Sequence, residues 1–427
     1  METIINPNRE DWSKILERPT QTVDNIESTV VNIFNDVKRH GDTAILKYTA
    51  LFDGSTLNTA IVSKDEIMTA SEYIDEDLKA AIKTAKDNIT SFHSAQVTSP
   101  VALQTTKGVD CWLEKRAIQK IGLYIPSGTA PLFSTVLMLA IPAQIAGCKE
   151  VVLCSPPNAE GKIANEILYA AQLCGVTKII KVGGIQAIAG LTFGTKEIPK
   201  VYKIFGPGNQ FVTVAKQLAT KYGVAIDMPA GPSELLVVAD DTAKANYVAS
   251  DLLSQAEHGP DSQVILISTS KGFIAKVQFE ISKQITLLPR FDIAQKAINN
   301  SKFIWVETND IALDIINEYA PEHFIICTKD EDFFIENIEN AGSVFIGNYT
   351  PESAGDYASG TNHTLPTNGF CKAYSGVNLD SFTKSITFQK ISKEGIINIG
   401  NTIELMADAE GLQAHKNAVS IRLNDLK

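Results

Sequence analysis

The sequence has no excess of positive charge and no basic run. Its 38 lysine and arginine residues are outnumbered by 49 acidic residues, which gives a net charge of −11. An acidic chain of this kind has no general electrostatic attraction for nucleic acid or for an anionic membrane surface. We therefore expect small-molecule partners, with no nucleic acid and no membrane.

A long apolar stretch is also missing. The most apolar run, residues 135–147, is interrupted by Pro142 and Gln144 and is shorter than the roughly 20 residues that a membrane-spanning helix needs. The N-terminus shows neither the cationic start nor the apolar segment of a secretory signal. We expect this run to form a buried helix and the protein to be cytoplasmic.

Cysteine is scarce and unpatterned. The six cysteines include no CxxC pair, which is the spacing of many metal and redox motifs. A reducing cytosol fits this usage better than a disulfide framework does. For each thiol, a buried and inert role is a better interpretation than a nucleophilic one.

What the sequence does contain is an alternation of helices and short β runs. With 427 residues, 44% of them hydrophobic, the chain is long enough for two or more structural units. Helices are predicted at 24–39 and 75–93. From residue 120 onward, β runs alternate with helices, which is typical of parallel βαβ units. We predict two α/β sheets in tandem, near 120–234 and 235–350.

Gln255 and His258 close a predicted amphipathic helix that starts at an Asp241 cap and stops at Gly259. Their i, i+3 spacing places both on one face, off the apolar stripe, where an amide oxygen and an imidazole nitrogen can converge on one ion. Two ligands do not complete a metal site. On spacing alone, an interaction of His258 with the last helix carbonyls is the more common explanation.

Glu322 and His323 follow Pro321, between a predicted helix and a strand. An acidic group and an imidazole side by side can divide general acid and base work, because their ordinary pKa values of about 4 and 6.5 bracket the working range. An exposed pair of this kind is also common by chance.

Two further segments carry candidate residues. Residues 352–369 are rich in small and turn-forming residues and include Asp356 and His363, and loops of this length are often functional. In the tail, Glu410 and His415 stand on either side of Gly411. A lone tail histidine is usually just solvated.

Two glycine turns are weak cofactor signals. A β run meets Gly206-Pro-Gly-Asn209 before a helix. This resembles half of a dinucleotide fingerprint, with Phe211 at the third glycine position. Close approach of the backbone to a phosphate and a plain structural turn explain this pattern equally well. The turn at 183–184, followed by Gln186, has the same ambiguity.

Taken in order, these segments resemble the histidinol dehydrogenase family. The matching strings include LYIPSGTAPLFSTVLMLAIPAQIAGC, KIFGPGNQFVT, AGPSELLV, LLSQAEHGPDSQ, YAPEHF and AEGLQAHKNAVSIR, within residues 24–422. The resemblance implies two-step oxidation of L-histidinol by NAD, through bound L-histidinaldehyde, to L-histidine, the last step of histidine biosynthesis. It also implies an α/β fold with two tandem Rossmann-like, aldehyde-dehydrogenase-like parallel-sheet domains, and a homodimer with shared active sites.

The resemblance implies a division of the chain as well. Residues 1–23 would form an N-terminal segment, and 24–123 with 235–375 a first α/β domain carrying the metal and catalytic residues. Residues 124–234 would form the NAD-binding domain. The tail, 376–427, would contribute to the site of the partner subunit.

Roles carried over from the family fall into four groups. One Zn²⁺ per subunit would be held by Gln255, His258, Asp356 and His415. Substrate contacts would be these four residues with Ser233, His323 and Glu410. NAD contacts would be Tyr124, Gln186 and Asn209. The catalytic residues would be Glu322, which activates water, and His323, the base of both hydride transfers; no cysteine thioester is required.

Departures from the family pattern are few. Ser127 replaces a common glycine, Ile185 replaces a small residue and Thr361 replaces a frequent proline; the first two adjoin the expected NAD segments and bear on cofactor affinity. Two other classes remain as alternatives, a zinc-dependent hydrolase with Glu322 as general base and a non-catalytic small-ligand binder. Formation of NADH from an alcohol substrate distinguishes the dehydrogenase from both.

Overall fold

A computed structural model describes residues 3–19, 24–127, 131–229 and 231–426 of the chain. Its contacts divide the chain into two compact units. The first unit comprises Met1–Ala95 and Ile118–Ser381, and the second comprises Gln96–Ala117 and Phe382–Lys427.

The first unit contains a six-stranded parallel sheet in the order β1-β11-β10-β9-β12-β13. Its three central strands are buried along their whole length, as a parallel sheet covered by helices on both faces requires. The strands are β1 (Thr3–Ile5), β9 (Glu234–Ala239), β10 (Gln263–Ser268), β11 (Lys302–Trp305), β12 (His323–Cys327) and β13 (Ser343–Ile346).

Helices cover both faces of this sheet with separate apolar cores. On one face lie α10 (Ala245–Ala256), α11 (Lys271–Gln284) and α12 (Phe291–Asn300). On the other lie α1 (Trp12–Ile15), α13 (Asn309–Tyr319) and α14 (Glu331–Asn337). The predicted α/β layering is confirmed here.

The same unit contains a second parallel sheet, with five strands in the order β6-β5-β4-β7-β8. The strands are β4 (Lys120–Tyr124), β5 (Glu150–Ser155), β6 (Lys178–Lys181), β7 (Lys203–Phe205) and β8 (Ala225–Ile226). The helices between them are α6 (Phe133–Ala146), α7 (Asn165–Leu173), α8 (Gly184–Phe193) and α9 (Gln210–Thr220). Residues 134–143 of α6 are buried, as expected. None of the described helices is long and apolar enough for a membrane span.

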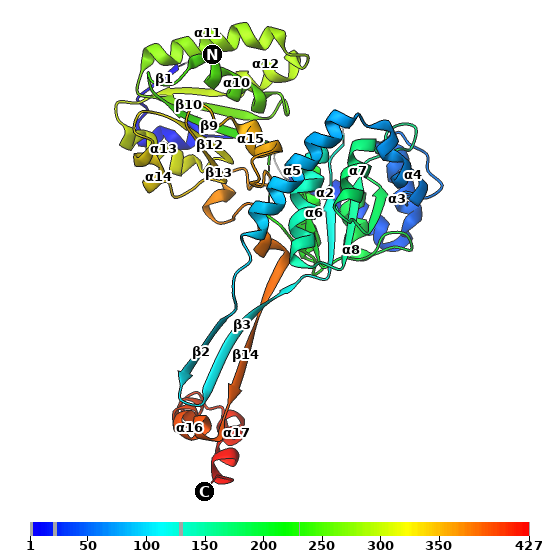
Figure 1. Cartoon of the computed structure of the whole chain (residues 1–427), viewed down its shortest axis with the longest axis vertical. Coiled ribbons are helices and arrows are strands. Elements are labelled where there is room, and N and C mark those ends of the chain that lie inside the picture. Colours follow the sequence, from blue (N-terminus) through cyan, green and yellow to red (C-terminus); the bar gives the residue numbers. More distant parts are fainter. Residues whose placement is uncertain (1–2, 20–23, 128–130, 230, 427) are drawn as a thin grey trace. The chain divides into compact units, whose positions relative to one another are not determined.

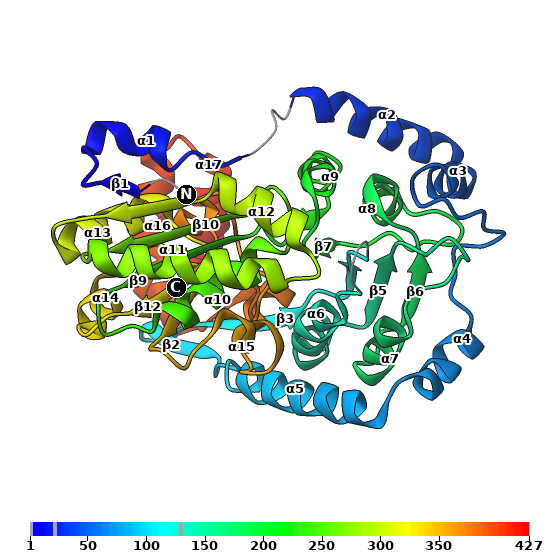
Figure 2. The ribbon, with the colours of Figure 1, turned by 90° about the horizontal axis from the view of Figure 1, so that it is seen from above.

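The helices between residues 24 and 94 pack on the helices of the five-stranded sheet (Figure 2). We expected them to accompany residues 235–375, but α2 (Asp24–His40) packs on α8 and α9, and α5 (Glu76–Ser94) packs on α6. The apolar face of α2, with Val30 and Phe34, enters the core of that sheet. Two shorter helices, α3 (Asp42–Phe52) and α4 (Lys64–Thr69), contact α8 and α7. α5 also contacts the 235–375 stretch, since the side chain of Asn88 donates to the carbonyl of Ala358 over 2.8 Å.

The second unit is a three-stranded antiparallel sheet with two helices (Figure 1). Its strands are β2 (Val101–Thr106), β3 (Val109–Ala117) and β14 (Thr383–Ile391), and its helices are α16 (Lys393–Ala409) and α17 (Gln413–Asn424). The expected tail began at residue 376 and did not include the β2–β3 hairpin. Many apolar side chains of this small unit are exposed, among them Val101, Leu103, Leu405, Met406 and Ile421.

Candidate functional site

Glu322 and His323 lie at the connection from α13 to β12. The helix ends at Tyr319 because Ala320 adopts a left-handed conformation, with φ of 53°, and Pro321 follows. His323 is the first residue of β12. The strand was expected to begin at Phe324, and it begins one residue earlier, so of the pair only Glu322 lies between the helix and the strand. The two side chains are buried, with exposed fractions of 7% and 4%.

The peptide groups of Glu234 hold both side chains. Its N–H donates to Oε2 of Glu322 over 2.8 Å, and its carbonyl oxygen is 3.2 Å from Nδ1 of His323. Because a carbonyl oxygen only accepts, Nδ1 must carry the hydrogen of this bond. Nε2 of His323 is buried without a hydrogen-bond partner among the described residues, 3.7 Å from Oδ1 of Asp356.

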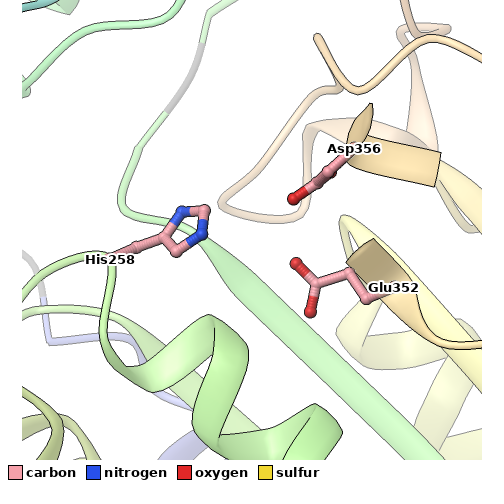
Figure 3. A group of neighbouring side chains, drawn as sticks. All are labelled: His258, Glu352 and Asp356. Atoms are coloured by element: carbon pink, nitrogen blue, oxygen red, sulfur yellow. The ribbon is translucent and has the colours of Figure 1, made fainter. Parts of the chain in front are cut away.

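A second cluster adjoins this pair. His258, Glu352 and Asp356 present ligand atoms that all lie within 4.8 Å of one another, and Figure 3 shows the three side chains pointing into one space. Imidazole and carboxylate groups at this separation are a suitable donor set for a transition-metal ion such as zinc. The spacing argument identified His258, and the family resemblance identified Asp356.

Glu352 is the member that the sequence analysis missed. It opens the short helix α15 (Glu352–Tyr357) and is 1% exposed. Its i, i+4 spacing from Asp356 places the two carboxylates on one helix face, and this spacing was the available signal. Ser254 donates to its Oε2 over 3.3 Å.

Gln255 and His258 were expected to lie together in the last helical turn, away from the buried face, and they do not. α10 ends at Ala256, so His258 lies in the following turn and is exposed, whereas Gln255 is completely buried. A buried amide is stable at this position because neighbouring polar groups can form hydrogen bonds with it. Its nitrogen lies 3.4 Å from Oε2 of Glu322, and in the rotated orientation the nitrogen donates to Glu352 while the oxygen accepts from the N–H of Glu234 over 3.0 Å.

The cluster has an excess of buried negative charge. Burial alone would lower the pKa of His323, but Glu322 and Glu352 raise it well above 6.5. Burial raises the pKa of Glu352, with Asp356 and Glu322 adding to the effect. Burial would also raise the pKa of Asp356, yet His323 and His363 lower it overall. A bound cation compensates such carboxylates, so the residues present fit a divalent metal.

His363 supports Asp356. Its Nδ1 is 2.9 Å from the carbonyl oxygen of Asp356, and its Nε2 is 3.2 Å from the hydroxyl of Thr135. With both ring nitrogens engaged, His363 links the α15 segment to α6. Burial lowers its pKa.

Of the six cysteines expected to be buried and inert, Cys154, Cys174 and Cys327 are buried, and Cys111, Cys148 and Cys371 are partly buried. Burial raises the pKa of Cys148 to about 11 and those of Cys174, Cys327 and Cys371 to about 12. Cys371 lies beside the Glu322–His323 turn, since its thiol donates to the carbonyl of Pro321 over 3.3 Å. A neutral thiol of this kind is a poor nucleophile.

Two of the three expected NAD contacts are buried at the five-stranded sheet. Tyr124 ends β4, and its hydroxyl accepts from the N–H of Gly184 over 3.1 Å. Gln186 is completely buried on α8, and neither atom of its amide has a hydrogen-bond partner among the described residues. An unpartnered buried amide is costly unless a polar ligand satisfies it. Carboxyl ends of parallel strands are where α/β sheets bind ligands, so this amide fits NAD.

Asn209 is exposed and caps α9, with its side chain accepting from the N–H of Val212 over 3.1 Å. The turn before it needs glycine. Gly206 has φ of 127°, and a Cβ there would collide with the carbonyl oxygen of Tyr124.

Asp53 gives a prediction about stability. Its carboxylate accepts from the N–H of Gly183, and burial raises its pKa from 3.8 to about 6. The folded state therefore binds this proton more tightly than the unfolded chain, and stability falls as the pH rises between those two values. We expect Asp53→Asn to raise the free energy of unfolding above pH 6 by about 1–2 kcal/mol, after allowance for partial exposure.

Denaturant titrations of the NAD-free protein between pH 4.5 and 8 measure this effect. The gain should shrink toward acid pH, and the exposed Asp87→Asn should show no such trend. A difference between Asp53→Asn and wild type that is independent of pH would contradict the prediction.

The remaining candidates are divided between the units. Ser233 directly precedes β9 and is half-buried. Glu410 and His415 belong to the second unit, where both are exposed on either side of Gly411 at the α16–α17 turn. The first unit brings together Gln255, His258, Glu322, His323 and Asp356.

Comparisons with known proteins give one consistent family. A family model described as Histidinol dehydrogenase matches residues 16–423. A histidinol dehydrogenase of Bacteroides thetaiotaomicron is 56% identical over 427 residues, covering 100% of both chains. A histidinol dehydrogenase of Escherichia coli K12 is 52% identical over 433 residues, covering 100% of this chain and 98% of its own.

Solved structures agree with these sequence matches. A crystal structure of histidinol dehydrogenase from Elizabethkingia anophelis has a TM-score of 0.97 and 52% identity, covering 100% of this chain and 98% of that one. A betaine aldehyde dehydrogenase variant from Staphylococcus aureus has a TM-score of 0.51 at 12% identity, covering 90% and 88%. The second likeness concerns the fold alone and agrees with the expected aldehyde-dehydrogenase-like architecture.

Proposed function

The chain belongs to the histidinol dehydrogenase family of oxidoreductases in histidine biosynthesis, and from this premise we propose how its residues divide the reaction. The reaction proposed is the NAD-dependent oxidation of L-histidinol through bound L-histidinaldehyde to L-histidine. The observation that carries the assignment of residues is the buried Glu322–His323 pair, held on the peptide of Glu234 beside the His258–Glu352–Asp356 group.

His323 serves as the base of both oxidation steps. The bond from Nδ1 to the carbonyl of Glu234 leaves Nε2 as the proton acceptor. A cation bound at the neighbouring carboxylates would offset the negative charge that raises the pKa of His323, so that Nε2 is free to take a proton. In the first step Nε2 takes the hydroxyl proton of the alcohol, and in the second it takes a proton from the hydrated aldehyde. The neighbouring Glu322 removes a proton from the water that hydrates the aldehyde.

The metal proposal is one Zn²⁺ per subunit, held by Gln255, His258, Asp356 and His415. When bound, zinc supplies a Lewis acid that binds and orients a nitrogen-bearing substrate. The donor set of amide, imidazoles and carboxylate supports zinc. Glu352, absent from the expected ligand set, orients the amide of Gln255 through a hydrogen bond in its rotated orientation.

The cofactor proposal places NAD at the five-stranded sheet and its N-terminal helices, against Tyr124, Gln186 and Asn209. When bound, NAD accepts a hydride in each step. The unpartnered amide of Gln186 and the close-packed glycine turn at Gly206 support this placement.

The assembly proposed is a cytoplasmic homodimer in which the second unit of one subunit completes the site of the other. Glu410 and His415 of one chain would then join Ser233 and the first-unit residues of its partner around L-histidinol. Val101, Leu103, Trp112 and Phe388 of the second unit line one hollow. This cluster supports a subunit interface, because contiguous exposed apolar surface commonly marks one.

Activity and metal dependence provide the direct test. We expect NADH to appear when L-histidinol is added and the rate to fall by at least tenfold after dialysis against a chelator. Far-UV circular dichroism should stay unchanged, because a core of this size does not depend on one ion. Adding back zinc should restore the rate. Full activity in metal-free protein would refute the metal proposal, and absence of NADH formation by the metal-loaded enzyme would refute the reaction.

A further inference from the structure

Glu234 is the residue on which the Glu322–His323 pair depends, and its own side chain is fixed by Arg18. We propose that Arg18 and Glu234 are positioning residues for the reaction, so that the N-terminal segment is part of the active-site scaffold. This inference rests on the proposed roles of Glu322 and His323. It assigns to Arg18 no contact with the substrate.

The backbone position of Glu234 determines where the side chains of Glu322 and His323 lie. Its N–H and its carbonyl oxygen bond to Glu322 and His323, over 2.8 Å and 3.2 Å. A displacement of the Glu234 backbone therefore moves the water-activating carboxylate and reorients the imidazole together. Misplacement of a reacting group by about 1 Å can cost about a hundredfold in rate.

The side chain of Glu234 holds that backbone in place. It is 2% exposed, and its carboxylate accepts from Nε of Arg18 over 2.5 Å, from Nη2 over 3.0 Å and from the N–H of Asn368 over 2.7 Å. This two-point pairing of a guanidinium with a carboxylate fixes direction as well as distance.

Arg18 also contacts Tyr319, which precedes the turn that leads to Glu322 and His323. Its Nη2 also donates to the carbonyl of Tyr319 over 2.7 Å, and its guanidinium lies 4.0 Å from the centre of the Tyr319 ring. Tyr319 is the last residue of α13. Arg18 thus clamps together the start of β9 and the turn that leads to Glu322 and His323.

Net stability alone does not account for this arrangement. A buried ion pair gains little over apolar packing, because removing both charges from water offsets their attraction. What the pair provides here is one defined position for the backbone of a residue whose N–H and carbonyl contact the two reacting side chains. A neutral replacement that preserves size should therefore affect the rate more than the folded structure.

The test compares Arg18→Met, Arg18→Lys and Glu234→Gln with the wild type, and with Arg9→Met as matched control. Arg9 lies in the same N-terminal segment but is exposed and has its guanidinium on Trp12. The measurements are kcat and KM for L-histidinol with the metal-loaded enzyme, bound metal per chain, and the isotope effect on kcat with substrate deuterated at the carbinol carbon. A loss that came only from inactive protein would lower kcat without changing the isotope effect.

We expect Arg18→Met and Glu234→Gln to lower kcat by about 10- to 100-fold, with a larger isotope effect and a KM changed by less than about threefold. Arg18→Lys, which keeps one charged contact, should lie between Arg18→Met and wild type. A kcat within threefold of wild type in Arg18→Met would overturn the inference. So would an equal loss in Arg9→Met, or a loss with an unchanged isotope effect. Wild-type enzyme that fails to oxidise L-histidinol would refute the proposed function instead.

Discussion

His323→Ala is expected to lower the rate of both oxidation steps by about a thousandfold, whereas Glu322→Gln should slow mainly the second step. General base catalysis by a positioned side chain commonly contributes between about 10² and 10⁴. Nε2 of His323 is a buried acceptor that the described residues leave without a hydrogen-bond partner. Removal of the imidazole therefore removes the proton acceptor of each hydride transfer.

Glu322→Gln separates the two roles. The amide oxygen can still accept from the N–H of Glu234, which Oε2 does over 2.8 Å, so the local structure should persist. A neutral amide cannot take a proton from water, and hydration is needed only before the second oxidation. Single-turnover assays that start from L-histidinol and from L-histidinaldehyde compare the steps. Equal losses in both steps would remove the water-activating role from Glu322.

Much of the first unit could be predicted because its signals are local. Buried parallel strands are short, almost wholly apolar runs, and the helices between them have their own periodicity. The end of the helix before Pro321 could also be predicted, since a proline disfavours helical conformation in the residue before it. What local patterns do not contain is the partner of an amphipathic helix. α2 has an apolar face, but nothing in that face identifies α8 and α9 as its neighbours.

The antiparallel pairing of β3 with β14 also could not be predicted from the sequence. β3 pairs with β14 in a register that joins Ala117 to Thr383 and Val109 to Ile391. No short turn connects these strands, so no hairpin signal exists in the sequence. The helical prediction for the tail was correct, but its association with residues 96–117 depends on tertiary contacts alone.

In the candidate site, the reactive and metal-binding residue types could be predicted from the sequence, but the burial of their side chains could not. Helical spacing placed Gln255 away from the apolar stripe, yet the side chain is buried because Glu322, Glu352 and the peptide of Glu234 satisfy its amide. Glu352 escaped notice because a glutamate in a polar loop resembles solvated surface. Its burial becomes visible only when α15 is placed against α10.

Mixing two inactive variants tests whether active sites are shared between subunits. The first unit holds Gln255, and the second holds His415 on α17, where it is exposed. In the proposed homodimer, each site takes Gln255 from one chain and His415 from the other. Gln255→Ala and His415→Ala should each be nearly inactive alone, because each loses a proposed metal ligand.

Co-refolding the two variants in equal amounts with zinc should restore about one quarter of wild-type activity. Random pairing makes about half of the dimers mixed, and each mixed dimer combines one doubly altered site with one intact site. Refolding each variant alone provides the control for spontaneous recovery. If the second unit instead completes the site of its own chain, every site in the mixture keeps one lesion and no activity returns. That result would contradict the shared site while leaving the assignment of the two ligands intact, since both single variants would still be inactive.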